Sequence, residues 1–239
     1  MTAHKPGDPT TLNRLYGRSQ GKPLRAGQQA LVDTLLPRIA VPAEGPVDAR
    51  RLFGADRPLH FEIGFGGGEH LAHRADLLPD HGFVGAEPFV NGVAQALVHV
   101  RDGALANVRI HHGDALEVLR RVPDGALTML YLLHPDPWPK AKHAKRRMMN
   151  DGPVRMFADK LKPGGEFHVA DWGRPHNALM RALFLIVRAL DGFENTRDNV
   201  TGNLPSLFVE GGFEGVTIRH ELPTMLGTMT LYSMRKPQE

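Results

Sequence analysis

The sequence predicts an α/β fold, a doubly wound sheet that is mostly parallel with an antiparallel last strand. Short apolar runs alternate with amphipathic segments from Leu59 onward, a glycine-rich turn follows the first run, and two adjacent β-rich runs lie between Gly215 and Arg235. Strands that alternate with helices indicate parallel pairing with helices on both faces of the sheet. A chain of 239 residues, 41% hydrophobic and 23% charged, is long enough for one such domain.

The N-terminal part precedes this alternation and differs from it in composition. Residues 1 to about 25 are polar, basic and punctuated by glycine and proline, and residues 26–39 place alanine and leucine at helical spacing. Residues 41–58 are rich in proline and glycine, so we expect a connection there and no regular element. We therefore predict a basic N-terminal arm and helix over residues 1–45 and the main domain over residues 46–239.

Strands and helices follow one another along the main domain. Apolar runs bounded by turn residues predict strands at Leu59–Ile63, Gly82–Ala86, Val108–His111, Leu127–Leu133 and Glu166–Ala170. Helical periodicity predicts helices directly after the glycines, from Asn91 to about Arg101, at Ala115–Arg121 and at Ala178–Leu190. Residues 162–165 are expected to form a turn, and the run from Gly215 to Arg235, split by Pro223 and Gly227, is expected to close the sheet with a hairpin.

Composition excludes several kinds of site. The chain has no cysteine, which rules out disulfides, thiolate metal sites and a cysteine nucleophile. Its 13 histidines show no metal-ligand spacing, so no metal is expected. The start lacks an apolar signal-peptide core, and Arg181 and Arg188 interrupt the most apolar helix candidate. We expect a soluble, cytoplasmic protein without a membrane segment, as a monomer or a homodimer.

Positive charge is concentrated in two segments. A net charge of +3 does not by itself indicate a nucleic-acid partner, although the sequence pI is about 9.3. Residues 140–147 carry lysine, arginine and histidine without an acidic residue, and a looser group in the N-terminal arm consists of Arg14, Arg18, Lys22 and Arg25. Such local segregation favours contact with phosphate groups.

A glycine-rich turn follows the first predicted strand and opens a helix, the context in which a loop binds a nucleotide-like ligand. Its glycines are Gly64, Gly66 and Gly68, a G-x-G-x-G spacing that differs from the G-x-G-x-x-G of dinucleotide-binding folds. The carboxylate of Glu62 would repel a pyrophosphate but suits the cationic end of a methionine moiety. The spacing resembles class I S-adenosylmethionine-dependent methyltransferases and argues against a dehydrogenase that binds NAD.

Two further acids follow the second and third predicted strands. Glu87 lies about twenty residues past the glycine turn, where doubly wound folds place the acid that accepts the ribose hydroxyls. Asp114 is suited to accept from an adenine amino group, and equally suited to cap the helix that begins at Ala115. With the glycine turn, these acids predict a nucleotide-type cofactor.

The loop after the fourth predicted strand is stiffened by prolines. It reads His134-Pro135-Asp136-Pro137-Trp138-Pro139-Lys140, and basic residues follow it directly. Each proline fixes its own φ and biases the preceding residue towards extended backbone, so Asp136 and Trp138 are held with little freedom. Ligands of open α/β sheets lie beyond the carboxyl ends of the strands, so this loop is expected to face the cofactor.

This loop with its basic tail resembles the signature of the tRNA (guanine-N7-)-methyltransferases, which have a Rossmann-like fold. The resemblance extends to the N-terminal Gly17–Arg25, the glycine loop with Glu62, Glu87-Pro88-Phe89, Gly113-Asp114-Ala115 and Leu161–Gly165. It implies methyl transfer from S-adenosyl-L-methionine to N7 of a guanine in tRNA, at position 46 in the variable loop.

The resemblance also implies roles for individual residues. Asp136 takes the catalytic position, and the cofactor-binding residues are Glu62, Gly64, Gly66, Glu87, Asp114 and Asp136. Substrate contacts are implied for Lys140, Asp171 and Glu210. The residues implied to meet RNA are Lys142, His143, Lys145, Arg146 and Arg147.

The sequence departs from the family pattern near its C-terminus. The family usually has R-P-x-T-[KR]-[YF]-E, whereas this chain reads Leu204-Pro205-Ser206-Leu207-Phe208-Val209-Glu210. Ala170 also stands where a threonine usually precedes the aspartate. A methyltransferase for another RNA or for a small molecule therefore stays open, as does a catalytically weak RNA-binding protein that keeps the cofactor pocket.

Overall fold

The computed structural model describes residues 21–135, 148–173, 204–224 and 227–238. Its helices are α1 (Ala26–Thr34), α2 (Leu36–Ile39), α3 (Ala49–Phe53), α4 (Glu69–Leu77), α5 (Val90–Asp102), α6 (Ala115–Leu119), α7 (Asp151–Lys160) and α10 (Leu204–Glu210). Its strands are β1 (Leu59–Ile63), β2 (Gly82–Ala86), β3 (Val108–His111), β4 (Leu127–Leu133), β5 (Leu161–Gly173), β6 (Glu214–Thr224) and β7 (Gly227–Arg235).

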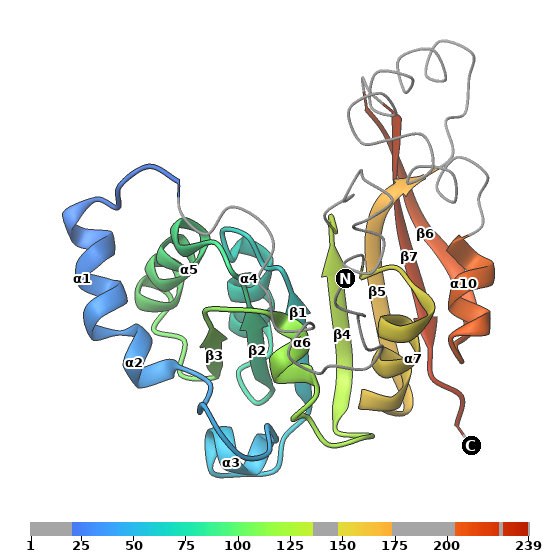
Figure 1. Ribbon diagram of the computed structural model, residues 1–239, viewed down its shortest axis with the longest axis horizontal. Helices are drawn as coiled ribbons and strands as arrows, with labels where there is room; N and C mark the ends of the chain where they lie inside the picture. Colours follow the sequence, from blue (N-terminus) through green and yellow to red (C-terminus); the bar gives the residue numbers. More distant parts are fainter. Residues whose placement is uncertain (1–20, 136–147, 174–203, 225–226, 239) are drawn as a thin grey trace, which may run out of the picture.

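The seven strands form one sheet in the order β3-β2-β1-β4-β5-β7-β6. Strands β1 to β5 pair in parallel, β7 runs antiparallel to β5, and β6 pairs antiparallel with β7. Figure 1 shows α1 and α5 at the β3 edge and α7 and α10 at the other end of the sheet. The predicted α/β sheet with an antiparallel last strand is confirmed.

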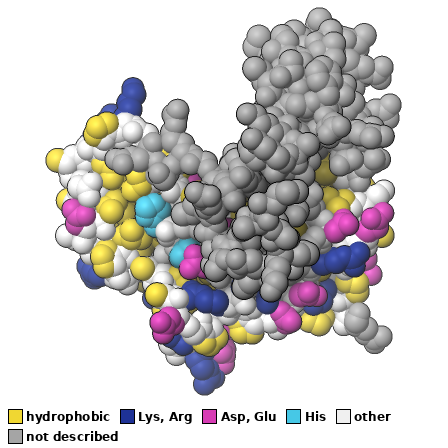
Figure 2. Space-filling view, viewed as in Figure 1, with side chains coloured by type: hydrophobic (Ala, Val, Ile, Leu, Met, Phe, Trp, Pro, Cys, Tyr) yellow, Lys and Arg dark blue, Asp and Glu magenta, His cyan; other side chains and the backbone are white. Residues whose placement is uncertain are grey.

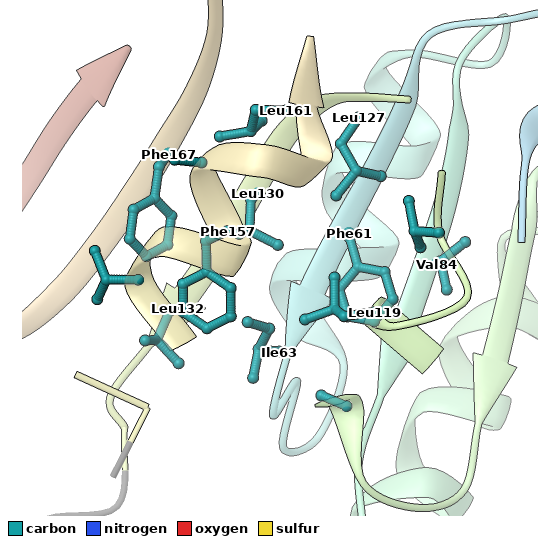
Figure 3. Close-up of a cluster of buried hydrophobic side chains, with 14 of the residues drawn as sticks. Phe61, Ile63, Val84, Leu119, Leu127, Leu130, Leu132, Phe157, Leu161 and Phe167 are labelled. Atoms are coloured by element: carbon teal, nitrogen blue, oxygen red, sulfur yellow. The ribbon is translucent and has the colours of Figure 1, made fainter. Parts of the chain in front are cut away.

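Helices cover the sheet through two hydrophobic clusters. One cluster joins α6, α7 and α10 to alternate residues of β1, β4 and β5, and Figure 3 shows Phe157 of α7 packed beside Leu130 and Leu132. The other joins α4 and α5 to Phe83 and Ile110, with apolar side chains of α1 and α2 packed against it. All five residues of β1 are buried, as expected for a strand covered on both faces.

Four predicted strands, those at β1 to β4, have the bounds that the sequence predicts. The expectation of no regular element between Val41 and Pro58 is wrong, because Asp48 caps α3 by accepting a hydrogen bond from the backbone N–H of Arg51. The helix predicted over residues 26–39 is interrupted at Leu35, and Pro37 opens the second piece.

The C-terminal half needs further corrections. Strand β5 is longer than predicted, since it begins at Leu161. The expected turn at residues 162–165 is an irregularity within this strand: Leu127 pairs with Leu161, and the next pair along the two strands is Met129 with Glu166. The helix predicted at Ala115–Arg121 ends at Leu119. The β6–β7 hairpin is confirmed. The helix predicted at Ala178–Leu190 lies outside the described residues.

In the part of the chain that the structure describes, no helix is long and apolar enough to cross a membrane. Within the same part, no group of three or more potential ligands is arranged to hold a metal ion.

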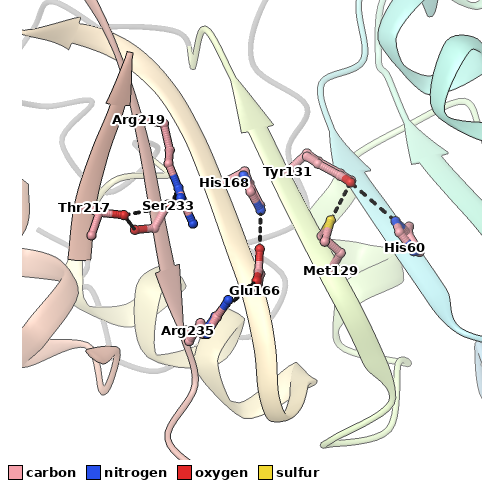
Figure 4. A network of polar contacts seen from close by, with 9 residues as sticks. All are labelled: His60, Met129, Tyr131, Glu166, His168, Thr217, Arg219, Ser233 and Arg235. Atoms are coloured by element: carbon pink, nitrogen blue, oxygen red, sulfur yellow. Dashed lines mark hydrogen bonds and ion pairs between the residues drawn. The ribbon is translucent and has the colours of Figure 1, made fainter. Parts of the chain in front are cut away.

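A polar network crosses one face of the sheet through β1, β4, β5, β7 and β6 (Figure 4). At its β1 end, His60 is 2% exposed, and its Nε2 lies 2.9 Å from Nδ1 of His81. Burial, and then the positive charge of His81, lower the pKa of His60 from 6.5 to about 3. The folded state therefore holds His60 neutral.

Because the folded state holds His60 neutral, we expect the protein to lose stability in acid. Because its folded pKa is below its unfolded pKa, its contribution is complete above pH 6.5 and declines as pH falls towards 3, by about 1.4 kcal/mol per pH unit. In the wild type, His60 is expected to account for roughly 2 kcal/mol of the fall in unfolding free energy between pH 7 and pH 5. In His60→Leu this part of the fall should be missing. Urea denaturation at both pH values measures this, with His73→Leu, at an exposed position of α4, as control. An unchanged pH dependence in His60→Leu would contradict it.

Candidate functional site

The acids predicted to bind a cofactor lie at the end of a strand or directly after one, and the carboxyl ends of these strands are hydrogen-bonded to one another. The backbone N–H of Gly64 donates to the carbonyl of Ala86 over 2.9 Å, which joins β1 to β2. The N–H of Glu87 donates to the carbonyl of His111 over 3.0 Å, which joins β2 to β3. The structure thus brings Glu62, Glu87 and Asp114 to one edge of the sheet.

The glycines of the turn serve two different purposes. All three have left-handed backbone, with φ of 65° at Gly64, 56° at Gly66 and 81° at Gly68, which favours glycine. A Cβ at Gly68 would lie 2.5 Å from the Cβ of Ala96, so that glycine allows α4 and α5 to pack closely. A Cβ at Gly64 or Gly66 would meet no atom within 4 Å. These two glycines therefore border open space among the described residues.

Glu87 is held by the backbone around it. Its side chain is 8% exposed; Oε2 accepts from the N–H of Gly66 and Oε1 accepts from the N–H of Phe89, both over 2.9 Å. A Cβ at Gly92 would lie 2.3 Å from the carbonyl oxygen of Gly66, so only glycine permits this approach of α5. These two backbone donors fix the carboxylate beside the glycine turn.

Glu62 precedes the glycine turn and is 3% exposed. Its Oε2 lies 2.8 Å from Nδ1 of His70, in the first turn of α4. The histidine side chain is 35% exposed and so connects the buried carboxylate with the surface. The sequence pattern did not single out His70, because nothing in a glycine-rich motif pairs residues on a strand and a helix.

Asp114 is the N-cap of α6, and its Oδ1 accepts from the N–H of Leu116 over 2.9 Å. The capping role that the sequence left open is thus present in the structure. A contact between Asp114 and an adenine amino group stays a prediction.

The ends of β4 and β5 lie side by side, since the N–H of His134 donates to the carbonyl of Ala170 over 2.8 Å. His134 has φ of 57°, so the chain turns sharply as it leaves β4. Asp171 is 8% exposed, within β5 and opposite Thr230 of β7. The predicted site residues that fall outside the described residues are Asp136, Lys140, Lys142, His143, Lys145, Arg146 and Arg147.

Glu210 is exposed at the last position of α10. Strand β6 starts shortly afterwards at Glu214, which pairs with Arg235 of β7. Arg235 in turn pairs with Glu166, in the first half of β5 and so away from the carboxyl end of that strand. The structure therefore does not bring Glu210 to the edge that carries Glu87, and its substrate contact stays a prediction.

The described part of the N-terminal arm is attached to α5. The side chain of Asn91 accepts from the N–H of Gly21 and donates to the carbonyl of Lys22, each over 2.8 Å. Asn91 lies four residues after Glu87 and directly before Gly92, which approaches the backbone of Gly66, so Gly21 and Lys22 are attached close to the glycine turn. Sequence reasoning singled out the arm but not this attachment.

Asn91→Ala is expected to release the arm. Two hydrogen bonds are lost at an exposed site, so we expect the amide of Gly21 to exchange about five-fold faster or more, with little change in global stability. Hydrogen exchange measured by NMR tests this, and Gln95→Ala on the same helix is the matched control. Equal exchange rates in the wild type and Asn91→Ala would show that the bonds do not hold the arm.

Basic and acidic side chains are interspersed over the described part of the face shown in Figure 2, and the described residues there form no single positive patch. The concentrated charge at residues 140–147 lies outside the described residues.

Comparisons with known proteins agree with the prediction. A family model described as "Putative methyltransferase" matches residues 56–205. The tRNA (guanine-N(7)-)-methyltransferase of Sphingopyxis alaskensis is 74% identical over 193 residues, which cover 79% of this chain and 80% of that protein.

Solved structures show that the fold is shared more widely than the reaction. Phosphoethanolamine N-methyltransferase 2 of Haemonchus contortus, in complex with S-adenosyl-L-methionine, is similar with a TM-score of 0.54 and 15% identity over 88% of this chain and 53% of that one. The [4+2]-cyclase SpnF is similar with a TM-score of 0.52 and 15% identity over 89% of this chain and 81% of that one. Likeness at this level establishes the fold and leaves the reaction to the site.

Proposed function

Because the chain belongs to the tRNA (guanine-N(7)-)-methyltransferase family, we propose that it transfers a methyl group from S-adenosyl-L-methionine to N7 of a guanine in tRNA. The observation that carries this proposal is the 74% identity to a protein of that name, over 80% of its length. The target position in the variable loop, a cytoplasmic location and a monomeric or homodimeric state stay predictions.

The described residues fit the cofactor. The open space beside Gly64 and Gly66 admits a ligand against the backbone, and Glu87 presents a fixed carboxylate there. In this assignment Glu87 accepts from the ribose hydroxyls, Glu62 holds the ammonium group, and Asp114 accepts from the adenine amino group through the carboxylate oxygen that does not cap α6. S-adenosyl-L-methionine supplies an electrophilic methyl group on a sulfonium.

The reaction itself does not require the protein to remove a proton from the substrate. Guanine N7 has an exposed lone pair, so it attacks the methyl group without first losing a proton, and no general base is needed. Positioning is the main task of the site. As the new bond forms, positive charge moves onto the purine, and a fixed carboxylate at Asp136 stabilises that charge. Asp171 and Lys140 are assigned to the guanine, and residues 142–147 to phosphates of the tRNA.

The altered run at Leu207–Val209 is the reason to keep a second substrate open. Phe208 stands in place of a basic residue, and it is fully buried with its ring 6.1 Å from that of Phe167 and 5.8 Å from that of Tyr232. This departure therefore serves packing of α10 on the sheet.

Methylation of unmodified tRNA with labelled S-adenosyl-L-methionine, followed by mapping of the modified base, tests the function. A product at guanine N7 is expected. A methyl group on another base or another RNA would establish the second substrate, and RNA binding without any product would establish a binding protein. Calorimetry with S-adenosylhomocysteine and with NAD separates the methyltransferase from a dehydrogenase.

A further inference from the structure

Glu62, which forms a pair with His70, is a carboxylate almost completely shielded from water. Glu62 is 3% exposed, and the 2.8 Å contact between its Oε2 and Nδ1 of His70 is direct. An ionised carboxylate only accepts hydrogen bonds, so Nδ1 carries the proton in this pair. The hydrogen bond thus satisfies one oxygen of a buried carboxylate and fixes the direction of the other.

The surroundings hold the His70 ring in this orientation. Tyr131 pairs with Glu62 across β1 and β4, and its ring lies 4.8 Å from that of His70 at an interplanar angle of 70°. Tyr131 is itself buried, with 5% exposure. The edge-to-face contact limits rotation of the imidazole, while its position in the first turn of α4 fixes its backbone directly after the glycine turn.

We propose that His70 is a positioning residue for cofactor binding, which holds the Glu62 carboxylate through Oε2 and so directs its Oε1 to the ammonium group of S-adenosyl-L-methionine. This inference rests on the proposed function, in which Glu62 meets the amino-acid end of the cofactor. Without His70 the buried carboxylate would lose this hydrogen bond, and its Oε1 would no longer be held in one orientation.

Two ligands separate this role from a general effect on folding. S-adenosylhomocysteine carries the amino-acid end, whereas 5′-methylthioadenosine lacks it and keeps only the nucleoside part. In calorimetry, His70→Ala is expected to bind S-adenosylhomocysteine at least about ten-fold more weakly than the wild type, because a hydrogen bond to a charged group is lost. The affinity for 5′-methylthioadenosine is expected to stay within about two-fold, which also reports that the pocket is folded.

Three further variants complete the experiment. His70→Asn carries an N–H donor close to the place of Nδ1 and is expected to restore most of the affinity for S-adenosylhomocysteine. His99→Ala is the matched control, since His99 also lies on a helix with its side chain 32% exposed, and it faces the exposed Glu69 at 3.8 Å. It should bind both ligands as the wild type does. Glu62→Gln is expected to lose affinity for S-adenosylhomocysteine alone.

The outcomes distinguish the inference from the function on which it rests. If Glu62→Gln discriminates between the two ligands but His70→Ala does not, the role of His70 is refuted and that of Glu62 stands. If Glu62→Gln binds both ligands normally, the assignment of the ammonium group to Glu62 fails first. Equal weakening of both ligands by His70→Ala would show a structural role only.

Discussion

Asp136→Ala is expected to lower the rate of methyl transfer to tRNA by at least about 100-fold, the size of effect seen when one electrostatic stabiliser of a transition state is removed. The reason is the positive charge that develops on guanine as N7 takes the methyl group. Without the carboxylate, that charge has no fixed counter-charge from the loop that follows β4. The fold is expected to stay intact, which urea denaturation measures.

Single-turnover methylation with saturating tRNA measures the chemical step separately from binding. Asp151→Ala is the control, since Asp151 is an exposed acid in the first turn of α7. Its rate should equal that of the wild type. Full activity in Asp136→Ala would remove this residue from the catalytic position.

Glu87→Ala is expected to weaken binding of S-adenosylhomocysteine by at least about 100-fold and to lower the free energy of unfolding by about 2–4 kcal/mol. The carboxylate accepts from two backbone N–H groups, of Gly66 and Phe89, and the substitution leaves both donors without this partner at a site that is 8% exposed. The glycine turn loses its fixed geometry, and the proposed ribose contact is lost with it.

Calorimetry and urea denaturation measure the two effects separately. Glu87→Gln keeps one acceptor oxygen and should give intermediate values for both, whereas Glu117→Ala, an exposed acid in the first turn of α6, should leave both unchanged. Wild-type affinity in Glu87→Ala would refute the cofactor contact, even if the protein became less stable.

The sequence predicted the central strands well and the short helices poorly. Strands β1 to β4 are short runs bounded by turn residues; β2 and β4 are almost wholly apolar, and β1 and β3 alternate apolar with polar residues. This signal depends on neighbours in the chain. Helix α3 has five residues, too few for periodicity, and α7 begins with Asp151-Gly152-Pro153, which reads as a turn. Proline is tolerated there because backbone nitrogens in the first turn of a helix make no hydrogen bond within the helix.

The sequence by itself determined the family, the glycine turn and the three acids at the ends of successive strands, because each depends on residue type at fixed spacing. The tertiary structure decided what these residues do to one another. It separated Gly68, which packs against Ala96, from Gly66, which borders open space. It also showed that the backbone holds Glu87 and that His70 holds Glu62. Spacing along a chain does not encode such contacts, since they form only when strands and helices distant in sequence pack together.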